Sequence, residues 1–221
     1  MFAGHYAIGL LAARSQTRIN LGVLILAAML CDLLWCVFLL LGIEHVSYQP
    51  GFGAAHYLAT WSVPYSHSLA MVVVWAALAA ACASVMLRDR RAAALLFAVV
   101  LSHWFADVIT DRNIPIIPGS RAAIGLNVWG SVPATLAVEG GLWLVAIVLY
   151  VKSTKARTFA GTYVFWVGVA LITGLWFSNI IGPPPPNPRT VPFVTLFLFL
   201  ILTGWGFWMN SARRPLPRRP A

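Results

Sequence analysis

The sequence predicts an all-α fold: a polytopic membrane helix bundle of about six transmembrane helices, preceded by a short N-terminal half-helix. Three observations support this. Of the 221 residues, 60% are hydrophobic and only 10% are charged. Several apolar runs reach the roughly 20 residues that one bilayer crossing needs. Lys and Arg gather at alternate ends of those runs. No soluble domain needs this much apolar surface, so the chain is expected to lie in a membrane.

The apolar runs define six crossings, and no stretch between them is long enough for a separate soluble domain. We therefore expect a single integral membrane domain over residues 1–221, with a basic cytoplasmic tail over 210–221. The crossings are expected at about 19–43, 68–87, 92–110, 133–151, 161–182 and 191–209.

The basic residues predict the orientation. All but three of the 15 Lys and Arg lie at the same side of the crossings, as Arg14, Arg88, Lys152 and Arg213 do. Basic residues mark the cytoplasmic side because they resist translocation and favour anionic headgroups. The C-terminus is therefore expected to be cytoplasmic. The net charge of +9 is therefore explained by basic residues that fix the membrane topology, and nucleic-acid binding is not needed to account for it.

The N-terminal segment Phe2 to Ala13 is apolar but too short to span a bilayer, because 12 residues of helix are only about 18 Å long. Two arrangements fit this length. The segment is either a half-helix that dips into the bundle and takes His5 to mid-depth, or an amphipathic helix lying flat on the cytoplasmic surface. It is not expected to be a signal peptide, because Arg14 and Arg18 follow it.

Two ionisable residues, His103 and Asp107, lie inside the crossing 92–110. An imidazole and a carboxylate in hydrocarbon are costly unless they are paired, hydrated or metal-bound, so such residues mark functional sites. Four residues apart on a helix, they share one face, and Asp111 continues that face by one turn. The alternative is a purely structural His–Asp pair.

Polar residues from other segments are expected at a similar depth. At about 1.5 Å of rise per residue, His103 lies about 10 Å and Asp107 about 5 Å below the outer end of their crossing, with Asp32 near the middle of the first. His67 lies at the outer mouth of the second crossing, and insertion of the N-terminal helix would bring His5 to the central level. Alternatively, Asp32 hydrogen-bonds a neighbouring Ser or Tyr, and His67 and His5 are interface residues.

The other ionisable side chains have simpler expected roles. Glu139 is expected to pair with Arg112 or Arg121 at the outer mouth. Asp89 is expected to be a local ion partner in an Arg-rich cytoplasmic turn. The residues expected to be solvated in the outer loop 44–66 are Glu44, His45 and His56.

Histidines and carboxylates at one depth are the donors that Zn²⁺, Mn²⁺ or Fe²⁺ prefers. Zinc is the expected ion. A divalent metal lowers the pKa of a bound water towards neutrality and polarises the scissile bond. Asp107 and Asp111 are the expected catalytic residues, each as a ligand, as the partner that orients an imidazole, or as the general base. The expected metal ligands are His5, Asp32, His67, His103 and Asp107.

These residues resemble a family, the predicted membrane-bound metal-dependent hydrolases of bacterial inner membranes, one branch of which is LexA-regulated. The matching elements, within about residues 1–120, are Gly4-His5-Tyr6-Ala7-Ile8-Gly9, Asp32, Tyr65-Ser66-His67-Ser68 and Ser102-His103-Trp104-Phe105-Ala106-Asp107. Only the His-Ser end of the family's His-Arg-Gly-x-Thr-His-Ser pattern is present, and one Asp stands where relatives have a Pro-Asp-Asp or Ile-Asp run. The resemblance implies a metal-dependent hydrolase of the bacterial inner membrane, and these departures weigh against a two-metal site.

We therefore expect a membrane-embedded hydrolase with one divalent metal in the outer half of the bundle. A site about 5–15 Å deep suits a lipid or lipid-linked ester, amide or phosphoester. The alternative is a transporter in which the same His/Asp set relays protons or passes a metal ion. In a third interpretation these residues only specify helix packing. The expected partners are membrane lipids and a lipid-like substrate, with no nucleic acid.

Overall fold

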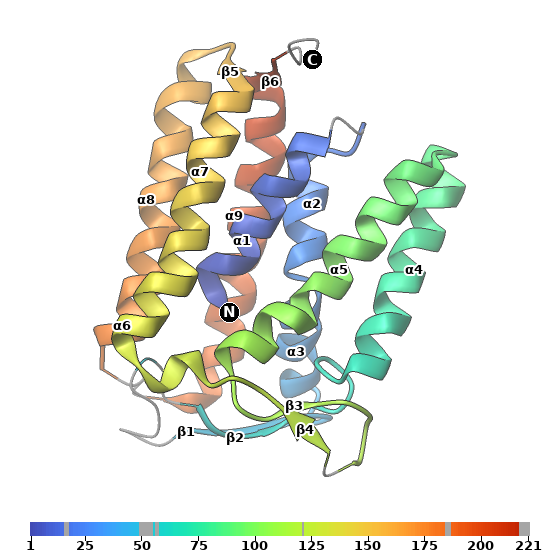
Figure 1. Ribbon diagram of the computed structural model, residues 1–221, viewed down its shortest axis with the longest axis vertical. Helices are drawn as coiled ribbons and strands as arrows, with labels where there is room; N and C mark the ends of the chain where they lie inside the picture. Colours follow the sequence, from blue (N-terminus) through green and yellow to red (C-terminus); the bar gives the residue numbers. More distant parts are fainter. Residues whose placement is uncertain (16–17, 49–54, 56–57, 121, 184–186, 217–221) are drawn as a thin grey trace.

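A computed structural model describes residues 1–15, 18–48, 55, 58–120, 122–183 and 187–216. Its helices form one bundle, whose long members run roughly along the vertical axis of Figure 1. Of the residues and segments named above, His56, Arg121 and residues 217–221 of the tail lie outside the described part of the chain.

The predicted fold class is confirmed, and the chain is a multi-pass membrane protein. Among the described residues, five helices are long and apolar enough to cross a membrane, and there are six if a bent pair counts as one span. The five are α4 (Leu69–Leu87), α5 (Arg90–Thr110), the continuous helical stretch Val132–Ser153, α8 (Phe159–Ile181) and α9 (Val191–Ala212). The stretch Val132–Ser153 consists of α6 (Val132–Thr135), a π-helical turn (Leu136–Gly140) and α7 (Gly141–Ser153).

The first expected crossing is broken into two helices. α2 (Leu21–Ala28) and α3 (Leu30–Leu40) meet at Met29 and are bent by 56° relative to one another. The Asn20 side chain caps the start of α2 by accepting a hydrogen bond from the Gly22 amide at 2.8 Å, which satisfies one of the free amides of a helix start. A single apolar run therefore contains a break at membrane depth.

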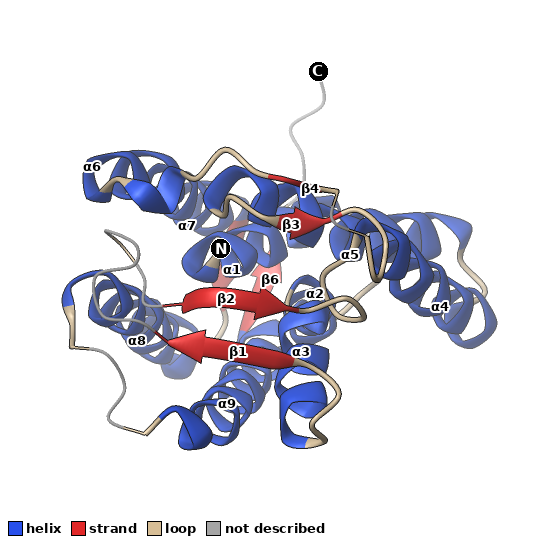
Figure 2. Cartoon of the chain, turned by 90° about the horizontal axis from the view of Figure 1, so that it is seen from below, coloured by secondary structure: helices blue, strands red, loops and turns tan. Residues whose placement is uncertain are grey.

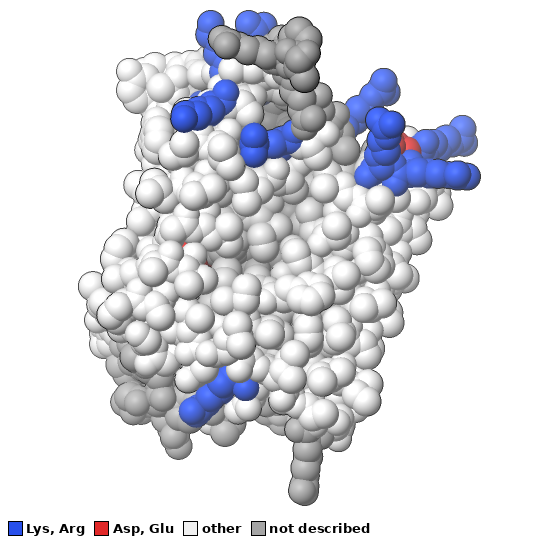
Figure 3. Space-filling view, in the orientation of Figure 1, with Lys and Arg blue, Asp and Glu red and all other residues white. Residues whose placement is uncertain are grey.

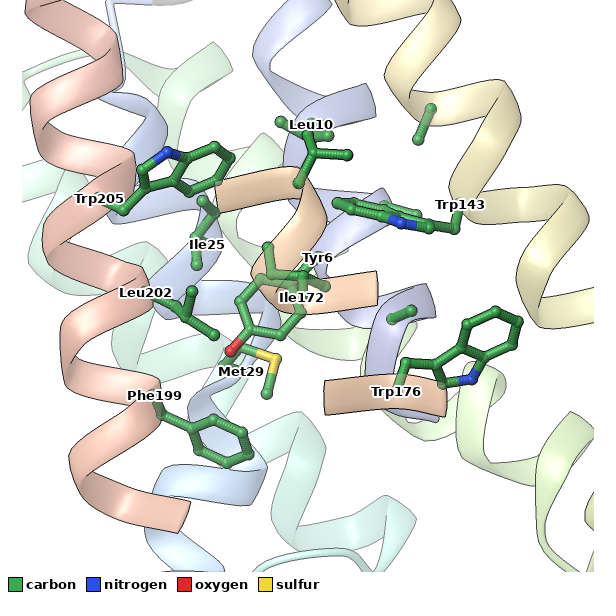
Figure 4. Packing of buried hydrophobic residues seen from close by; sticks show 14 of the residues in the cluster. Tyr6, Leu10, Ile25, Met29, Trp143, Ile172, Trp176, Phe199, Leu202 and Trp205 are labelled. Carbon is green, nitrogen blue, oxygen red and sulfur yellow. The ribbon is translucent and has the colours of Figure 1, made fainter. Parts of the chain in front are cut away.

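The N-terminal helix α1 (Phe2–Ala12) is inserted in the bundle and does not lie on its surface. Tyr6 and Leu10 are buried, and Figure 4 shows them packed among side chains of α2, α7, α8 and α9. Seen from one end, α1 lies between α7 and α2 (Figure 2). The sequence left this choice open because α1 is apolar on every side, and only its neighbours show which side is buried.

Short strand pairs lie at the two ends of the bundle. Figure 3 shows basic side chains gathered at the end where the α4–α5 turn lies, and β5 (Thr154–Ala156) pairs with β6 (Arg213–Pro215) at that end. We call the opposite end the outer end. There, β1 (His45–Tyr48) pairs with β2 (Leu58–Ser62), and β3 (Ile114–Pro115) pairs with β4 (Ala123–Ile124). These two pairs lie across the outer helix ends (Figure 2).

Glycines let α2 and α9 approach closely. A Cβ atom added at Gly206 would lie 3.0 Å from the Gly22 Cα atom, and one added at Gly22 would lie 2.7 Å from the backbone nitrogen of Phe207. Small residues are enriched at such contacts in membranes because close backbone approach increases van der Waals packing. This contact holds the broken helix pair against α9.

We predict that Gly22→Ala lowers the stability of the protein by about 1–3 kcal/mol, because the added methyl group meets backbone that cannot move aside. The measurement is the midpoint temperature of thermal denaturation in detergent, taken from the fraction of protein that stays monodisperse after heating. Gly204→Ala is the matched control, since a Cβ at Gly204 meets nothing within 4 Å. Equal midpoints for the two variants would contradict the packing.

Candidate metal centre

Five side chains from four separate segments meet in the outer half of the bundle. His5 comes from α1, Asp32 from the first turn of α3, His67 from the turn before α4, and His103 and Asp107 from α5. The three histidines and Asp107 are buried, and the Asp32 side chain is 19% exposed. The structure therefore brings together all five expected ligands, while their use in metal binding stays a prediction.

The nitrogens of two histidines lie among the oxygens of both aspartates. His67 Nε2 is 3.4 Å from Asp32 Oδ1 and 3.6 Å from Asp107 Oδ2. His103 Nε2 is 3.8 Å and 3.1 Å from the same two oxygens. The two Nε2 atoms are 3.4 Å apart. The five separations that involve a histidine nitrogen thus fall between 3.1 and 3.8 Å.

The helix break positions His103. Ala28 is the last residue of α2, and carbonyls at a helix end lack partners within the helix. His103 Nδ1 donates to the Ala28 carbonyl at 2.7 Å. With the proton on Nδ1, the Nε2 atom keeps its lone pair for the cluster, which is how metal-binding histidines are usually oriented. The same break places Asp32 in the first turn of α3.

His67 is oriented by a serine and a buried glutamate. The Ser66 hydroxyl donates to Glu44 Oε2 at 2.6 Å, so it accepts from His67 Nδ1 at 2.7 Å. Glu44 Oε1 also accepts from the backbone amides of Tyr65 and Ser66, both at 2.8 Å. The Glu44 carboxylate thus holds the turn before α4. Through Ser66 it also keeps the ring proton of His67 on Nδ1, so that the lone pair of the imidazole is on Nε2.

Glu44 was expected to be solvated, and this was wrong, because the residue is only 1% exposed. Its place in the outer loop gave no sign of burial, although Ser66 beside His67 could have suggested an orienting hydrogen bond. Ser66 and Glu44 are 22 residues apart, so only the tertiary fold brings them together. The exposed neighbour His45 is solvated as expected.

His5 contacts the same cluster from the N-terminal helix. Its ring stacks on His103 with the ring centroids 3.8 Å apart. His5 Nε2 is 3.1 Å from Asp107 Oδ1 and 3.9 Å from Asp32 Oδ2. His5 Nδ1 is buried and has no hydrogen-bond partner among the described residues. The amino group of Met1 also donates to Asp107 Oδ1, at 2.5 Å.

Asp111 and Glu139 lie next to the cluster. Asp111 is buried, accepts from the Arg112 amide at 2.7 Å, and has its carboxyl pKa raised by burial. Glu139 is fully buried in the π-helical turn and accepts from the amides of Gly4 at 3.2 Å and from the indole of Trp129 at 3.3 Å. Glu139 was expected to pair with Arg112 or Arg121 at the outer mouth, and this expectation gave no sign that its side chain is buried.

Asp89 was expected to be an ion partner in the cytoplasmic turn. Its side chain caps the start of α5 by accepting from the Arg91 and Ala92 amides.

A cavity of about 480 Å³ reaches this cluster. Five acidic or histidine side chains line its inner wall: Asp32, His67, Asp107, Asp111 and Glu139. Its other walls come largely from the outer halves of α8 and α9, including Leu175, Trp176, Leu198 and Phe199. The arrangement therefore joins a polar centre to an apolar chamber, a combination typical of small-molecule sites.

No family model, no curated protein and no solved structure matches the chain. Its function is therefore inferred from the geometry of this centre and from the motifs in the sequence. The buried His/Asp groups fit a metal ion, since they include His5, His103 and Asp107 in one group and Asp32, His67 and His103 in another.

We predict that Glu44→Gln reverses the hydrogen bonds that orient His67. The side-chain oxygen of the new glutamine still accepts from the Tyr65 and Ser66 backbone amides. Its NH₂ group therefore faces the Ser66 hydroxyl and donates to it. The serine hydroxyl then donates to His67 Nδ1, and the proton moves to Nε2. Side-chain ¹⁵N chemical shifts of His67 will report this change of tautomer, and affinity for a divalent metal is expected to fall about 10–100-fold.

The control for this variant is His45→Ala, which alters an exposed residue beside Glu44. It should leave both the ¹⁵N chemical shifts of His67 and the metal affinity unchanged. Retention of the proton on His67 Nδ1 in Glu44→Gln would contradict the proposed orientation.

Proposed function

We propose that this protein is a metal-dependent hydrolase embedded in the membrane, with a divalent ion, zinc by preference, held by Asp32, His67, His103 and Asp107. The observation that supports it most is the spacing of the four donor atoms. Ligands about 2.0–2.2 Å from a tetrahedral zinc lie about 3.3–3.6 Å from one another. The five separations that involve a histidine nitrogen, 3.1–3.8 Å, bracket this range.

The chemical character of the donors agrees with this spacing. Two carboxylates removed from water repel one another and are stabilised by positive charge nearby. The Met1 amino group contacts Asp107, and an ion at the imidazole nitrogens would bring positive charge to Asp32 as well. Nitrogen and oxygen donors suit zinc, manganese or ferrous ions. An ion bound there would polarise the scissile bond and lower the pKa of the attacking water.

The surrounding residues have roles that need no metal contact. The Ala28 carbonyl and Ser66 hold His103 and His67 in the ligating tautomer. Asp111 is one helical turn from Asp107 and lines the same cavity, so it is placed to accept a proton from a cavity water as the general base. Asp107 contacts the histidines directly, and its catalytic role is that of a ligand.

The cavity supports a lipid or lipid-linked ester, amide or phosphoester as the substrate. Its lining includes Ser178 and Asn179 of α8 and Val194 of α9, all of them exposed. These residues are on membrane-crossing helices, so we propose that the chamber opens to the bilayer along the α8–α9 seam. A substrate with an acyl chain can enter from the membrane by this route and place its polar bond at the His/Asp cluster.

The location follows from the charge distribution and from the resemblance to the bacterial family. The basic end of Figure 3 is proposed to be cytoplasmic. The C-terminus would then be cytoplasmic, and the site would lie near the outer leaflet of a bacterial inner membrane. Membrane lipids are the proposed partners, and nucleic acid is not among them.

Transport receives less support from the structure. A carrier needs polar groups along the whole path. Among the described residues, every buried charged side chain except Arg213 lies at the cluster or on its outer side. Towards the inner end, the buried neighbours of the cluster are apolar, as at Leu10, Leu24 and Val99.

We predict that purified protein retains a divalent metal and that His103→Ala abolishes this binding, because the substitution removes one nitrogen ligand and the bond to Ala28. Metal content is measured by mass spectrometry of the eluted protein. His45→Ala is the control and should keep the metal. Equal metal content in His103→Ala and His45→Ala would exclude the proposed centre.

Chelation should abolish hydrolysis of a lipid ester or phosphoester in mixed micelles, and added zinc should restore it.

We further predict that Thr195→Trp slows hydrolysis of long-chain substrates by about tenfold or more, equivalent to about 1.4 kcal/mol, because Thr195 lines the cavity. A short-chain soluble analogue should be affected much less. Phe197→Trp is the matched control, since Phe197 is on the same helix, is 64% exposed and is not part of the cavity lining. Equal slowing of both substrates would argue against entry along the α8–α9 seam.

A further inference from the structure

Glu139 is a buried carboxylate without a cationic partner. It is fully buried and lines the cavity. Its Oε1 accepts from the Gly4 amide at 3.2 Å and its Oε2 from the Trp129 indole at 3.3 Å, and both donors are neutral. Among the described residues, no Lys, Arg or His forms an ion pair with it, and the Met1 amino group donates to Asp107. A buried carboxylate is costly unless a cation pairs with it, and the cavity is where a cation can reach it.

Three tryptophans line the cavity with this carboxylate. They are Trp35 of α3, Trp129 and Trp176 of α8. Trp129 donates directly to Glu139. Trp176 packs against the π-helical turn, because a Cβ added at Gly140 would lie 2.8 Å from Cη2 of its ring. The face of an indole attracts ammonium groups more strongly than any other aromatic side chain does. A carboxylate flanked by tryptophans is thus the chemistry that recognises an organic ammonium.

Trp176 (Figure 4) also carries a hydrogen-bond donor without an acceptor. Its side chain is only 5% exposed, and its Nε1 atom is buried with no hydrogen-bond partner among the described residues. Buried indole N–H groups usually have a partner, and this residue lies in the cavity wall. Because an indole N–H only donates, the ligand is expected to present an oxygen in addition to its cation.

The remaining walls of the cavity agree with such a ligand. No Lys or Arg side chain is found among the described residues of the lining, whereas four carboxylates are. An anionic headgroup would therefore find no cationic side chain there. Leu198 and Phe199 of α9 belong to the apolar part of the lining, which suits an acyl chain. The ligand that matches the whole cavity is an amphiphile with a positively charged head.

We propose that the cavity selects a lipid with an ammonium headgroup, either a primary amine or a trimethylammonium, held by Glu139 and the three tryptophans. The proposal rests on the proposed function and narrows its substrate. Gly4, which donates to Glu139, directly precedes His5. The ammonium position is therefore beside the metal centre, and the Trp176 N–H is available to a headgroup oxygen.

Lipid binding to the wild-type protein tests the proposal without any variant. Native mass spectrometry of the full-length protein in detergent gives affinities for phosphatidylethanolamine, phosphatidylcholine and phosphatidylglycerol with identical acyl chains. At least one of the two ammonium lipids should bind about tenfold more tightly than phosphatidylglycerol. Thr195→Trp, which narrows the cavity, should remove this preference, and Phe197→Trp, outside the lining, should keep it. Equal affinities of the wild type for all three lipids would overturn the proposal.

Two variants assign the preference to the residues named. Glu139→Gln removes the charge, so the three lipids should bind almost equally, while His45→Ala should behave as the wild type does. Trp176→Phe breaks no hydrogen bond within the described protein and weakens the attraction to a cation, so it should reduce the preference. Trp166→Phe is its control, since Trp166 is on the same helix, is 49% exposed and is not part of the lining. Melting curves show which variants are folded, and a full preference in folded Glu139→Gln would contradict the site.

Metal content and hydrolysis are measured on the same samples, so the two proposals fail separately. Equal lipid affinities in a protein that keeps its metal and its chelator-sensitive hydrolysis would overturn the headgroup selection and leave the hydrolase intact. Absence of bound metal together with a clear preference for ammonium lipids would instead overturn the hydrolase and leave the cavity as a lipid-binding site.

Discussion

Two aspartates and three histidines buried together at membrane depth are the constraint around which the molecule is arranged. Asp107 is almost completely buried and Asp32 is only partly exposed, and neither carboxylate can be left without positive charge in such a place. The oxygens of these carboxylates lie mostly 3.4–3.8 Å from the Nε2 atoms of His67 and His103, which is long for a direct hydrogen bond, and the His/Asp groups could hold a metal ion.

The irregular parts of the fold lie at the same level as this centre. The break at Met29 ends α2 at Ala28, whose carbonyl orients His103. The π-helical turn Leu136–Gly140 contains the buried Glu139, which accepts from the first helix at the Gly4 amide. Irregular backbone within a membrane is tolerated only where it is buried in protein or lines a cavity, and π-helical turns are frequent at functional sites. The outer strand pairs close the same end of the bundle and bring Glu44 onto the turn that presents His67.

The cavity relates the chemistry to the surrounding lipid. A polar wall of carboxylates and imidazoles faces an apolar chamber built by α8 and α9, the part of the chain in which the sequence shows no motif. Conversely, all five proposed ligands come from the first half of the chain. The two halves therefore have different tasks in the proposed enzyme: the first provides the donors, and the last helices shape the space that an acyl chain would occupy.

The sequence alone determined the membrane class, the helical fold and the identities of the five clustered side chains, because charge inside an apolar run is costly enough to stand out at His103, Asp107 and Asp32. It did not determine that α1 is inserted, since an evenly apolar helix gives no sign of which face is buried. It also missed Glu44, whose burial depends on a turn 22 residues away. The division of each carboxylate between two sets of partners was decided only by the tertiary structure, because the direction in which an oxygen points depends on how separate helices pack, and no spacing along one helix encodes it.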